Sequence, residues 1–348
     1  MKKIDLEAHF YTEEYLKYLR TRKEAPKEEP HEGARRVWLE HNVWQSHGLG
    51  LMDRLLDLAE GRLKAMDEAG IDVQVLSLSA PGCEQFSPAD GTALAKKTND
   101  ELAKVIKRYP DRFIGLAALA PQSPGEAADE LERAVKELGL NGAKVHSHVG
   151  DTYLDDKKYW VIFERAEKLD VPIYIHPTAP HPSLLKAYND YGFALAGPAL
   201  GFGAETALQA LRLIYSGVFD KYPGLKIILG HLGEGLIFWM DRIDFAFKKP
   251  WMGEELIPKI NKRPSEYIRS NFIVTISGMF ATPAVMCVLH EIGADRMMFA
   301  TDYPYEQSEE ATSFMERLPI SDIDKEKIYH LTAERLFKLA AYPRSSIY

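Results

Sequence analysis

Residues 158–177 read KYWVIFERAEKLDVPIYIHP, and this stretch decides the fold class of the chain. The segment 158–169 places apolar side chains at helical spacing, and the run VPIYI that follows is short, apolar and rich in β-branched residues. The pattern predicts a helix over 158–169 and a buried strand over 171–177. A helix that leads directly into an apolar strand is the repeating unit of a parallel α/β sheet.

The same alternation runs along the whole chain. Eight short apolar segments predict strands, at 4–10, 71–79, 112–118, 142–148, 171–177, 225–231, 272–278 and 296–302. Segments with helical spacing alternate with them, at 53–69, 90–109, 125–138, 158–169, 204–216, 234–247, 282–292, 308–317 and 324–339. Eight strand–helix units in 348 residues predict a TIM (β/α)8 barrel.

The surplus length predicts insertions near 11–50, 177–203 and 248–270. Residues 23–30 of the first insertion are charged and include two prolines, so we expect a loop there. An open, doubly wound sheet is the alternative fold. It is less favoured because no glycine-rich phosphate-binding motif follows the first strand.

Composition narrows the function classes. Asp and Glu outnumber Lys and Arg by 51 to 43, and the resulting net charge of −8 disfavours a nucleic-acid-binding protein. No apolar run is long enough to predict a transmembrane helix, and acidic residues interrupt any signal-peptide pattern near Met1. Two cysteines are too few for a disulfide scaffold and are typical of the cytoplasm. We therefore expect a cytoplasmic protein that binds neither nucleic acid nor membrane.

Histidines and acids gather at the ends of the predicted strands, where barrel enzymes place their active sites. Glu7 and His9 are two residues apart on the first strand, so their side chains share one face. His176 ends the fifth strand, and Asp302 ends the eighth. Each residue alone also fits an ordinary role, such as a core histidine or a turn cap. Together they predict a site for one divalent metal, because imidazole and carboxylate are ligands that zinc and similar ions prefer.

Other strand ends carry further histidines. His231 ends the sixth strand, and Glu234 follows where it is placed to orient the imidazole. Glu234 also fits the simpler role of a favourable acid near a helix N-terminus. His146 and His148 share one face at the end of the fourth strand. We expect His146 to contact a substrate rather than to bind the metal.

Four motifs resemble the decarboxylase branch of the amidohydrolase superfamily: EAHF at 7–10, YIHP at 174–177, ILGHLGE at 228–234 and FATDYP at 299–304. The resemblance covers nearly the whole chain and includes PDRF at 110–113, AET at 204–206, GVFD at 217–220 and RID at 242–244. This branch includes decarboxylases of γ-resorcylate (2,6-dihydroxybenzoate), 2,3-dihydroxybenzoate and 5-carboxyvanillate. The resemblance implies a single barrel domain over 1–348 that forms a homodimer or homotetramer.

The resemblance also implies roles for individual residues. Glu7, His9, His176 and Asp302 would hold one divalent metal, and His231 would sit beside the substrate with support from Glu234. Two arginines would bind the substrate: Arg242, and Arg54, which would reach into a neighbouring subunit's site.

Two departures from the family pattern matter. Some relatives lack the second ligand on the first strand, so His9 favours zinc over manganese. The branch usually carries asparagine where this chain has His146, which leaves the ring substituents of the substrate open.

The expected activity is metal-dependent, non-oxidative decarboxylation of a hydroxylated aromatic carboxylic acid, with release of carbon dioxide. Asp302 would donate the proton to the ring carbon, and His231 would hydrogen-bond a substrate oxygen. The alternative is hydrolysis of an ester, lactone or amide at the same site with Asp302 as base, because one fold serves both chemistries. A non-catalytic binding protein is a third hypothesis, and it requires a missing ligand residue.

Overall fold

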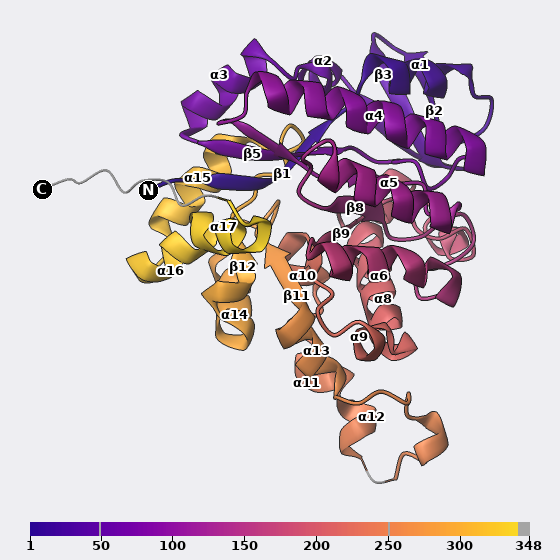
Figure 1. The fold of residues 1–348 in the computed structure, drawn as a ribbon, viewed down its shortest axis with the longest axis vertical. Coiled ribbons are helices and arrows are strands. Elements are labelled where there is room, and N and C mark those ends of the chain that lie inside the picture. Colours follow the sequence, from indigo (N-terminus) through magenta and orange to yellow (C-terminus); the bar gives the residue numbers. More distant parts are fainter. Residues whose placement is uncertain (49, 250, 340–348) are drawn as a thin grey trace, which may run out of the picture.

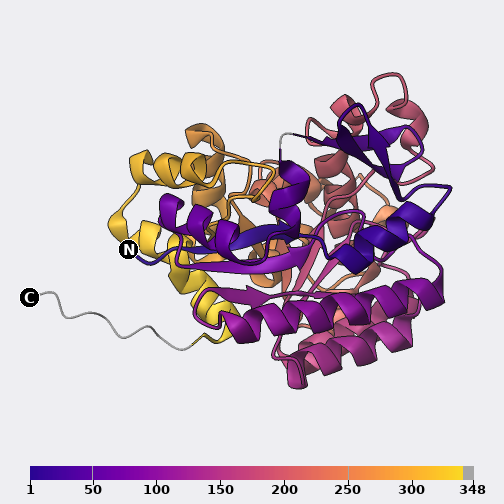
Figure 2. The same ribbon diagram turned by 90° about the horizontal axis from the view of Figure 1, so that it is seen from above.

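The computed structural model describes residues 1–48, 50–249 and 251–339. Parallel strands lie at its centre, and helices lie outside them (Figures 1 and 2). One group of strands has the order β1 (Ile4–Phe10), β5 (Val73–Leu78) and β6 (Phe113–Gly115). The other has the order β12 (Met297–Met298), β11 (Phe272–Thr275), β10 (Ile227–Leu229), β9 (Ile173–His176), β8 (Ala143–His146) and β7 (Ala117–Ala118). All neighbours in both groups pair in parallel, which confirms the predicted parallel α/β class.

Backbone hydrogen bonds connect the two groups of strands. Only Leu116 separates β6 from β7, so the strand predicted over 112–118 is present with one interruption. At the other edge, the N–H of Leu6 donates to the carbonyl of Phe299 at 3.0 Å, and the N–H of His9 donates to that of Tyr303 at 2.7 Å. The segment that follows β12 therefore lies beside β1, the first strand of the chain.

The strands are buried because helices cover them. All seven residues of β1 are buried, including the alternating polar residues Asp5, Glu7 and His9. The covering helices include α3 (Glu60–Ala69), α4 (Pro88–Arg108), α5 (Pro124–Lys136), α6 (Trp160–Leu169), α8 (Gly201–Ser216), α13 (Pro264–Asn271), α14 (Thr282–Ile292), α15 (Ser308–Arg317) and α17 (Thr332–Phe337). The short helix α16 (Asp322–Glu326) has no buried residue. Polar groups on a strand buried this deeply need partners, so the polar face of β1 marks a site rather than a wet edge.

Two predicted helices are wrong as continuous elements. The segment 53–69 forms α2 (Leu51–Leu56) and α3, because the carboxylate of Asp57 accepts hydrogen bonds from the N–H groups of Ala59 (2.8 Å) and Arg62 (3.1 Å). The segment 234–247 forms the short helices α10 (His231–Glu234), α11 (Met240–Ile243) and α12 (Phe245–Lys248). The left-handed backbone of Glu234 and Gly235, with φ values of 55° and 80°, prevents a continuous helix there. Apolar spacing does not reveal either interruption.

The first insertion is more ordered than expected. After α1 (Glu13–Thr21), the predicted loop at 23–30 contributes to an antiparallel sheet of β2 (Lys27–His31), β3 (Ala34–Glu40) and β4 (Val43–His47). Pairing with β3 outweighs the low strand propensity of β2, whose sequence is KEEPH. This inserted sheet lies to one side of the parallel strands (Figure 2).

The other two insertions also contain helices. Residues 177–203 include α7 (Phe193–Ala196), and α9 (Val218–Lys221) follows α8. The stretch 248–270 includes most of α13. The segment that carries α11 and α12 extends away from the parallel strands (Figure 1). Among the residues that the structure describes, no helix combines the length and the apolar character needed to cross a membrane.

Candidate metal centre and active site

Four side chains predicted from separate strand ends meet at one point. Glu7 and His9 project from β1, His176 ends β9, and Asp302 follows β12. Each offers a ligand atom, and these four atoms all lie within 4.8 Å of one another. His9 Nε2 lies 2.8 Å from Asp302 Oδ1, and His176 Nε2 lies 3.2 Å from Glu7 Oε1. The structure thus brings together the four residues selected from the sequence.

The donor set fits a divalent cation. Glu7 and His9 are completely buried, yet Glu7 Oε1 has no hydrogen-bond partner within the described part of the chain. A buried carboxylate oxygen without a partner is costly unless a cation compensates it. His176 Nδ1 donates to the carbonyl of Pro177 at 2.7 Å, which leaves Nε2 unprotonated and directed at Glu7. Two imidazoles and two carboxylates match the ligand preference of zinc and neighbouring metals.

The electrostatics of the cluster favour the protonation states that metal binding requires. Burial raises the pKa of Glu7, but His176, His231 and His9 outweigh it and hold that pKa well below its usual value. Burial, together with the positive charge of Lys144, lowers the pKa of His176 well below its usual value. An ionised carboxylate and a neutral imidazole are the forms that bind metals.

His231 and Glu234 form a pair next to this cluster. His231 Nδ1 lies 2.9 Å from Glu234 Oε1, and His231 Nε2 lies 3.8 Å from Asp302 Oδ2. The backbone of His231, Leu232 and Glu234 is left-handed, with φ values of 48°, 58° and 55°. Such backbone costs about 1–3 kcal/mol per residue. This compact turn allows Glu234 to hold the ring while Nε2 faces Asp302.

The same contacts set the charges of this pair. Burial lowers the pKa of His231, but Glu234, Asp302 and Glu7 outweigh it and raise that pKa well above its usual value. Burial raises the pKa of Asp302, but hydrogen bonds with His231 and His9 outweigh it and lower that pKa. These contacts favour the proton on His231 rather than on Asp302, where the sequence-based mechanism placed it.

His146 lies buried on β8 beside the metal cluster. Its ring centroid is 5.4 Å from that of His176. Its Nδ1 donates to Glu84 at 3.1 Å, and its backbone N–H donates to the same carboxylate at 2.9 Å. His146 Nε2 is buried and has no hydrogen-bond partner among the described residues. A Cβ at Gly82 would lie 2.3 Å from His146 Nδ1, so the Glu84–His146 pair requires glycine there.

Sequence reasoning missed Lys144 and Glu84. Lys144 is 3% exposed, and its Nζ lies 3.2 Å from His9 Nδ1. Burial lowers the pKa of Lys144 to about 8. Its spacing of two residues from His146 was a usable signal, because both must lie on one face of β8. Glu84 pairs with His146 across 62 residues, and neither residue type nor spacing indicates that contact.

Three other residues considered in the sequence analysis do not belong to the cluster of four candidate ligands. His148 has ring nitrogens 2.9 Å from the carbonyl oxygens of both Gly150 and Ala179. Arg242 is exposed on α11, and its guanidinium lies 4.4 Å from the ring centroid of Phe245. Arg54 is exposed on α2. The substrate-binding roles of the two arginines remain predictions.

Buried, metal-fitting ligands at the ends of parallel strands match the class that the sequence motifs indicate. The chain belongs to the amidohydrolase family, whose sequence profile matches residues 4–339. γ-Resorcylate decarboxylases from Polaromonas sp. (strain JS666) and Rhizobium sp. (strain MTP-10005) are 44% and 41% identical to it over 298 residues. Each of these matches covers 83% of this chain and 90% of the relative.

Solved structures agree with these relatives. A dihydroxybenzoic acid decarboxylase from Polaromonas sp. JS666, with bound manganese and the inhibitor 2-nitroresorcinol, has a TM-score of 0.85 and 40% identity, over 97% of both chains. A 5-carboxyvanillate decarboxylase from Sphingomonas paucimobilis has a TM-score of 0.88 and 34% identity, over 97% of this chain and 99% of that one. The resemblance to the decarboxylase branch is confirmed.

Proposed function

We propose that this protein is a carboxy-lyase that decarboxylates hydroxylated aromatic carboxylic acids, such as dihydroxybenzoates, in a metal-dependent and non-oxidative reaction. The observation that carries the proposal is the convergence of Glu7, His9, His176 and Asp302, with His231 Nε2 only 3.8 Å from Asp302. Relatives at 44% and 41% identity are γ-resorcylate decarboxylases, which supports this substrate class.

The proposed architecture is a single closed (β/α)8 barrel domain with loop insertions. The parallel order of the strands supports it, as do the hydrogen bonds that join the segment after β12 to β1. Closure would place the ends of β1, β8, β9 and β12 around one opening, where barrel active sites lie.

The proposed cofactor is one divalent metal ion per subunit, held by the four ligand residues. Zinc is our first candidate because two of the four ligands are imidazoles, and manganese is the second because it is bound in the Polaromonas relative. When bound, such an ion neutralises and orients the carboxylate and the adjacent phenolic oxygen of the substrate. Elemental analysis of the purified protein identifies the metal.

The chain's own residues supply the remaining steps. His231, with Nδ1 held by Glu234, donates a hydrogen bond from Nε2 to a phenolic or carboxylate oxygen of the substrate. The proton that His231 holds passes through Asp302, 3.8 Å away, to the ring carbon; the bond between that carbon and the carboxylate then breaks, its electron pair restores the aromatic ring, and carbon dioxide leaves. His146 contacts a ring substituent, because its Nδ1–H donates to Glu84 and leaves Nε2 as an acceptor for a hydroxyl group.

We propose that the protein acts in the cytoplasm as a homodimer or homotetramer. Its two cysteines are free thiols, which suits a reducing compartment. Phe238, Trp239 and Trp251 are 77%, 52% and 70% exposed, and large exposed apolar side chains of this kind mark interaction surfaces. Arg242 lies among them on an extended segment, so assembly would be needed to bring it to a substrate, and Arg54 is proposed to reach a neighbouring site.

The test is a substrate panel for the metal-loaded protein. The panel contains 2,6-dihydroxybenzoate, 2,3-dihydroxybenzoate and 5-carboxyvanillate, together with an aryl ester and a lactone. We expect carbon dioxide release from at least one phenolic acid and none after chelation of the metal. Turnover of the lactone without carbon dioxide release from any phenolic acid would replace the proposal with the hydrolase alternative.

A further inference from the structure

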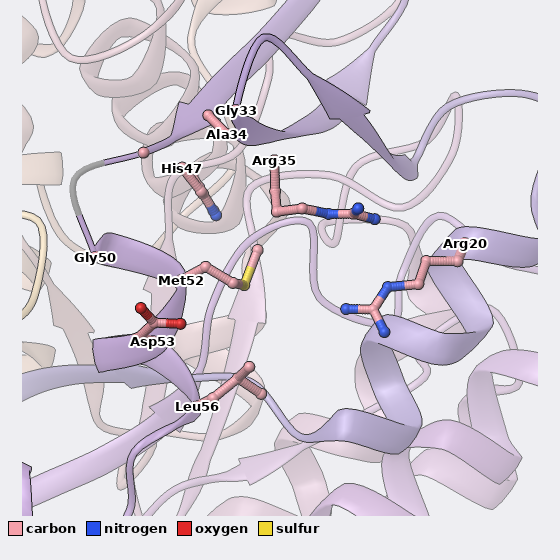
Figure 3. A pocket seen from close by; sticks show the side chains of 10 residues that line it. Arg20, Gly33, Ala34, Arg35, His47, Gly50, Met52, Asp53 and Leu56 are labelled. Atoms are coloured by element: carbon pink, nitrogen blue, oxygen red, sulfur yellow. The ribbon is translucent and has the colours of Figure 1, made fainter.

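A cavity of about 610 Å³ lies between the inserted sheet, α1 and α2 (Figure 3). The cavity is formed by side chains from all three parts: Arg20, Ala34, Arg35, His47, Met52, Asp53 and Leu56, with glycines at 33, 48 and 50. None of the four proposed metal ligands belongs to this wall. The volume exceeds what a single benzoate ring requires, and it lies within the range of small-molecule sites.

Two arginines line one end of the cavity. Arg20 and Arg35 both direct Nε at the carboxylate of Glu28, which is buried beneath them, and Arg20 does so at 2.6 Å. The two guanidinium groups share this one buried carboxylate through their Nε atoms, so each keeps N–H groups that Glu28 does not occupy. Arg20 also lies 3.6 Å from the exposed Glu13. The two guanidinium groups extend toward each other across the cavity, and Asp53 lies apart from them on α2 (Figure 3).

A buried histidine lines the same space. His47 is 3% exposed, and its ring points into the cavity (Figure 3). Its Nε2 donates to Gln45 Oε1 at 3.2 Å, whereas its buried Nδ1 has no hydrogen-bond partner among the residues that the structure describes. Burial lowers the pKa of His47 to about 4, so the ring is neutral and Nδ1 is an acceptor. A buried acceptor without a donor indicates a ligand that supplies one.

These groups match one ligand chemistry. The arginines offer donors to a carboxylate, Nδ1 of His47 accepts from a hydroxyl group, and Ala34, Met52 and Leu56 offer apolar surface to a ring. We propose that this cavity is a second binding pocket for a hydroxylated aromatic carboxylate, with the carboxylate on Arg20 and Arg35 and a ring hydroxyl on His47. The choice of an aromatic acid as the ligand rests on the proposed function.

The pocket lies close to the proposed catalytic centre. The His47 ring is 6.0 Å from that of Tyr305, and the Tyr305 ring is 5.5 Å from that of His9, a proposed metal ligand. A substrate anion held in the pocket is therefore separated from the metal cluster by two aromatic rings. The net charge of the chain is −8, so guanidinium donors of this kind would offset the repulsion of an anionic substrate only locally.

The experiment is calorimetric titration of the metal-loaded protein with 3-hydroxybenzoate and with benzoate. The titrations use an ionic strength of about 0.01 M, where the Debye length is about 30 Å and salt screens charge interactions only weakly. We expect two sites per chain for 3-hydroxybenzoate. Arg35→Gln should weaken one of them at least about tenfold, and Arg35→Lys should weaken it less, because lysine keeps the charge but loses the planar fork. His47→Phe should remove the preference of that site for 3-hydroxybenzoate over benzoate.

The control is Arg212→Gln, which changes an exposed arginine paired with Asp155 outside the cavity. It should leave both sites intact. Circular dichroism and metal content verify that each variant is folded. Two results would overturn the proposal of a second pocket: a single site that Arg35→Gln does not affect, or an equal loss of affinity in Arg212→Gln. Carbon dioxide release in the substrate panel tests the proposed function separately, so either proposal can fail while the other stands.

Discussion

The metal cluster and the inserted-sheet cavity both concentrate opposite charges, but they differ in burial and in scaffold. The metal cluster is built from the ends of parallel strands, and its two proposed ligands on β1, Glu7 and His9, are completely buried. In the cavity, the side chains of Arg20 and Arg35 are 40% and 30% exposed, and they come from an insertion. Charges act strongly where water is excluded and weakly where solvent screens them.

The difference in burial indicates different roles: catalysis for the metal cluster and ligand binding for the cavity. A rigid, dry cluster holds its ligands in place before the metal or the substrate arrives, which is what catalysis requires. A half-exposed pair of arginines contributes to binding and to the association rate instead. Substitutions in the metal cluster should therefore change activity by orders of magnitude, whereas those in the insertion should change stability or affinity modestly. The following predictions test this ranking from the largest effect to the smallest.

The largest effect is expected for His176→Ala, which removes one of the two proposed imidazole ligands. We expect the affinity for the metal to fall by more than about 10²-fold, the upper end for residues that merely support a ligand. Elemental analysis should find little metal, and turnover should be lost. The matched control is His41→Ala, at an exposed histidine of the insertion. Full metal content in His176→Ala would remove this residue from the ligand set.

Asp302→Asn should follow, because asparagine keeps the shape and an oxygen atom but removes the transferable proton. We expect kcat to fall by about 10²–10⁴-fold, the usual contribution of a positioned acid. Steady-state carbon dioxide release measures the loss, and circular dichroism checks the fold. Asp111→Asn, at an exposed position, is the control. Activity like that of the unchanged protein would refute the role of Asp302.

His231→Asn should reduce kcat by about 10²-fold, because it removes a charge-assisted hydrogen bond to the substrate. His231 lies outside the set of four ligand atoms, so the metal content should stay unchanged. Kinetics and elemental analysis on the same sample measure both quantities. If the variant loses its metal, His231 belongs among the ligands and the division of roles made above is wrong.

The smallest effect is expected in the insertion. Glu28→Gln leaves two guanidinium groups without their shared buried carboxylate, and we expect a destabilisation of about 1–3 kcal/mol. The half-exposed arginines favour the lower end of that range. Calorimetry should record a lower Tm while the metal content is unchanged. An unaltered Tm would show that this pair of contacts contributes nothing to stability, and loss of metal would show that the two regions are coupled.

The sequence predicted the convergence of Glu7, His9, His176 and Asp302 because the signals for it are local. Glu7 and His9 share a face by spacing alone, and the predicted strand 4–10 has the limits of β1. The ends of parallel strands meet at one edge, so the positions of His176 and Asp302 at strand ends were enough to place them in the same cluster. By contrast, the interruption of the helix predicted over 53–69 depends on the Asp57 side chain, which apolar spacing does not report.

The sequence by itself determined the parallel α/β class, the strand ends and the four candidate ligands. Only the tertiary structure placed Lys144 against His9, paired Glu84 with His146, and formed the cavity around Arg20, Arg35 and His47. Periodicity shows which face of an element is buried, because it follows from the geometry of that element alone. It contains no information on which distant side chains meet, because those contacts are set by how whole elements pack.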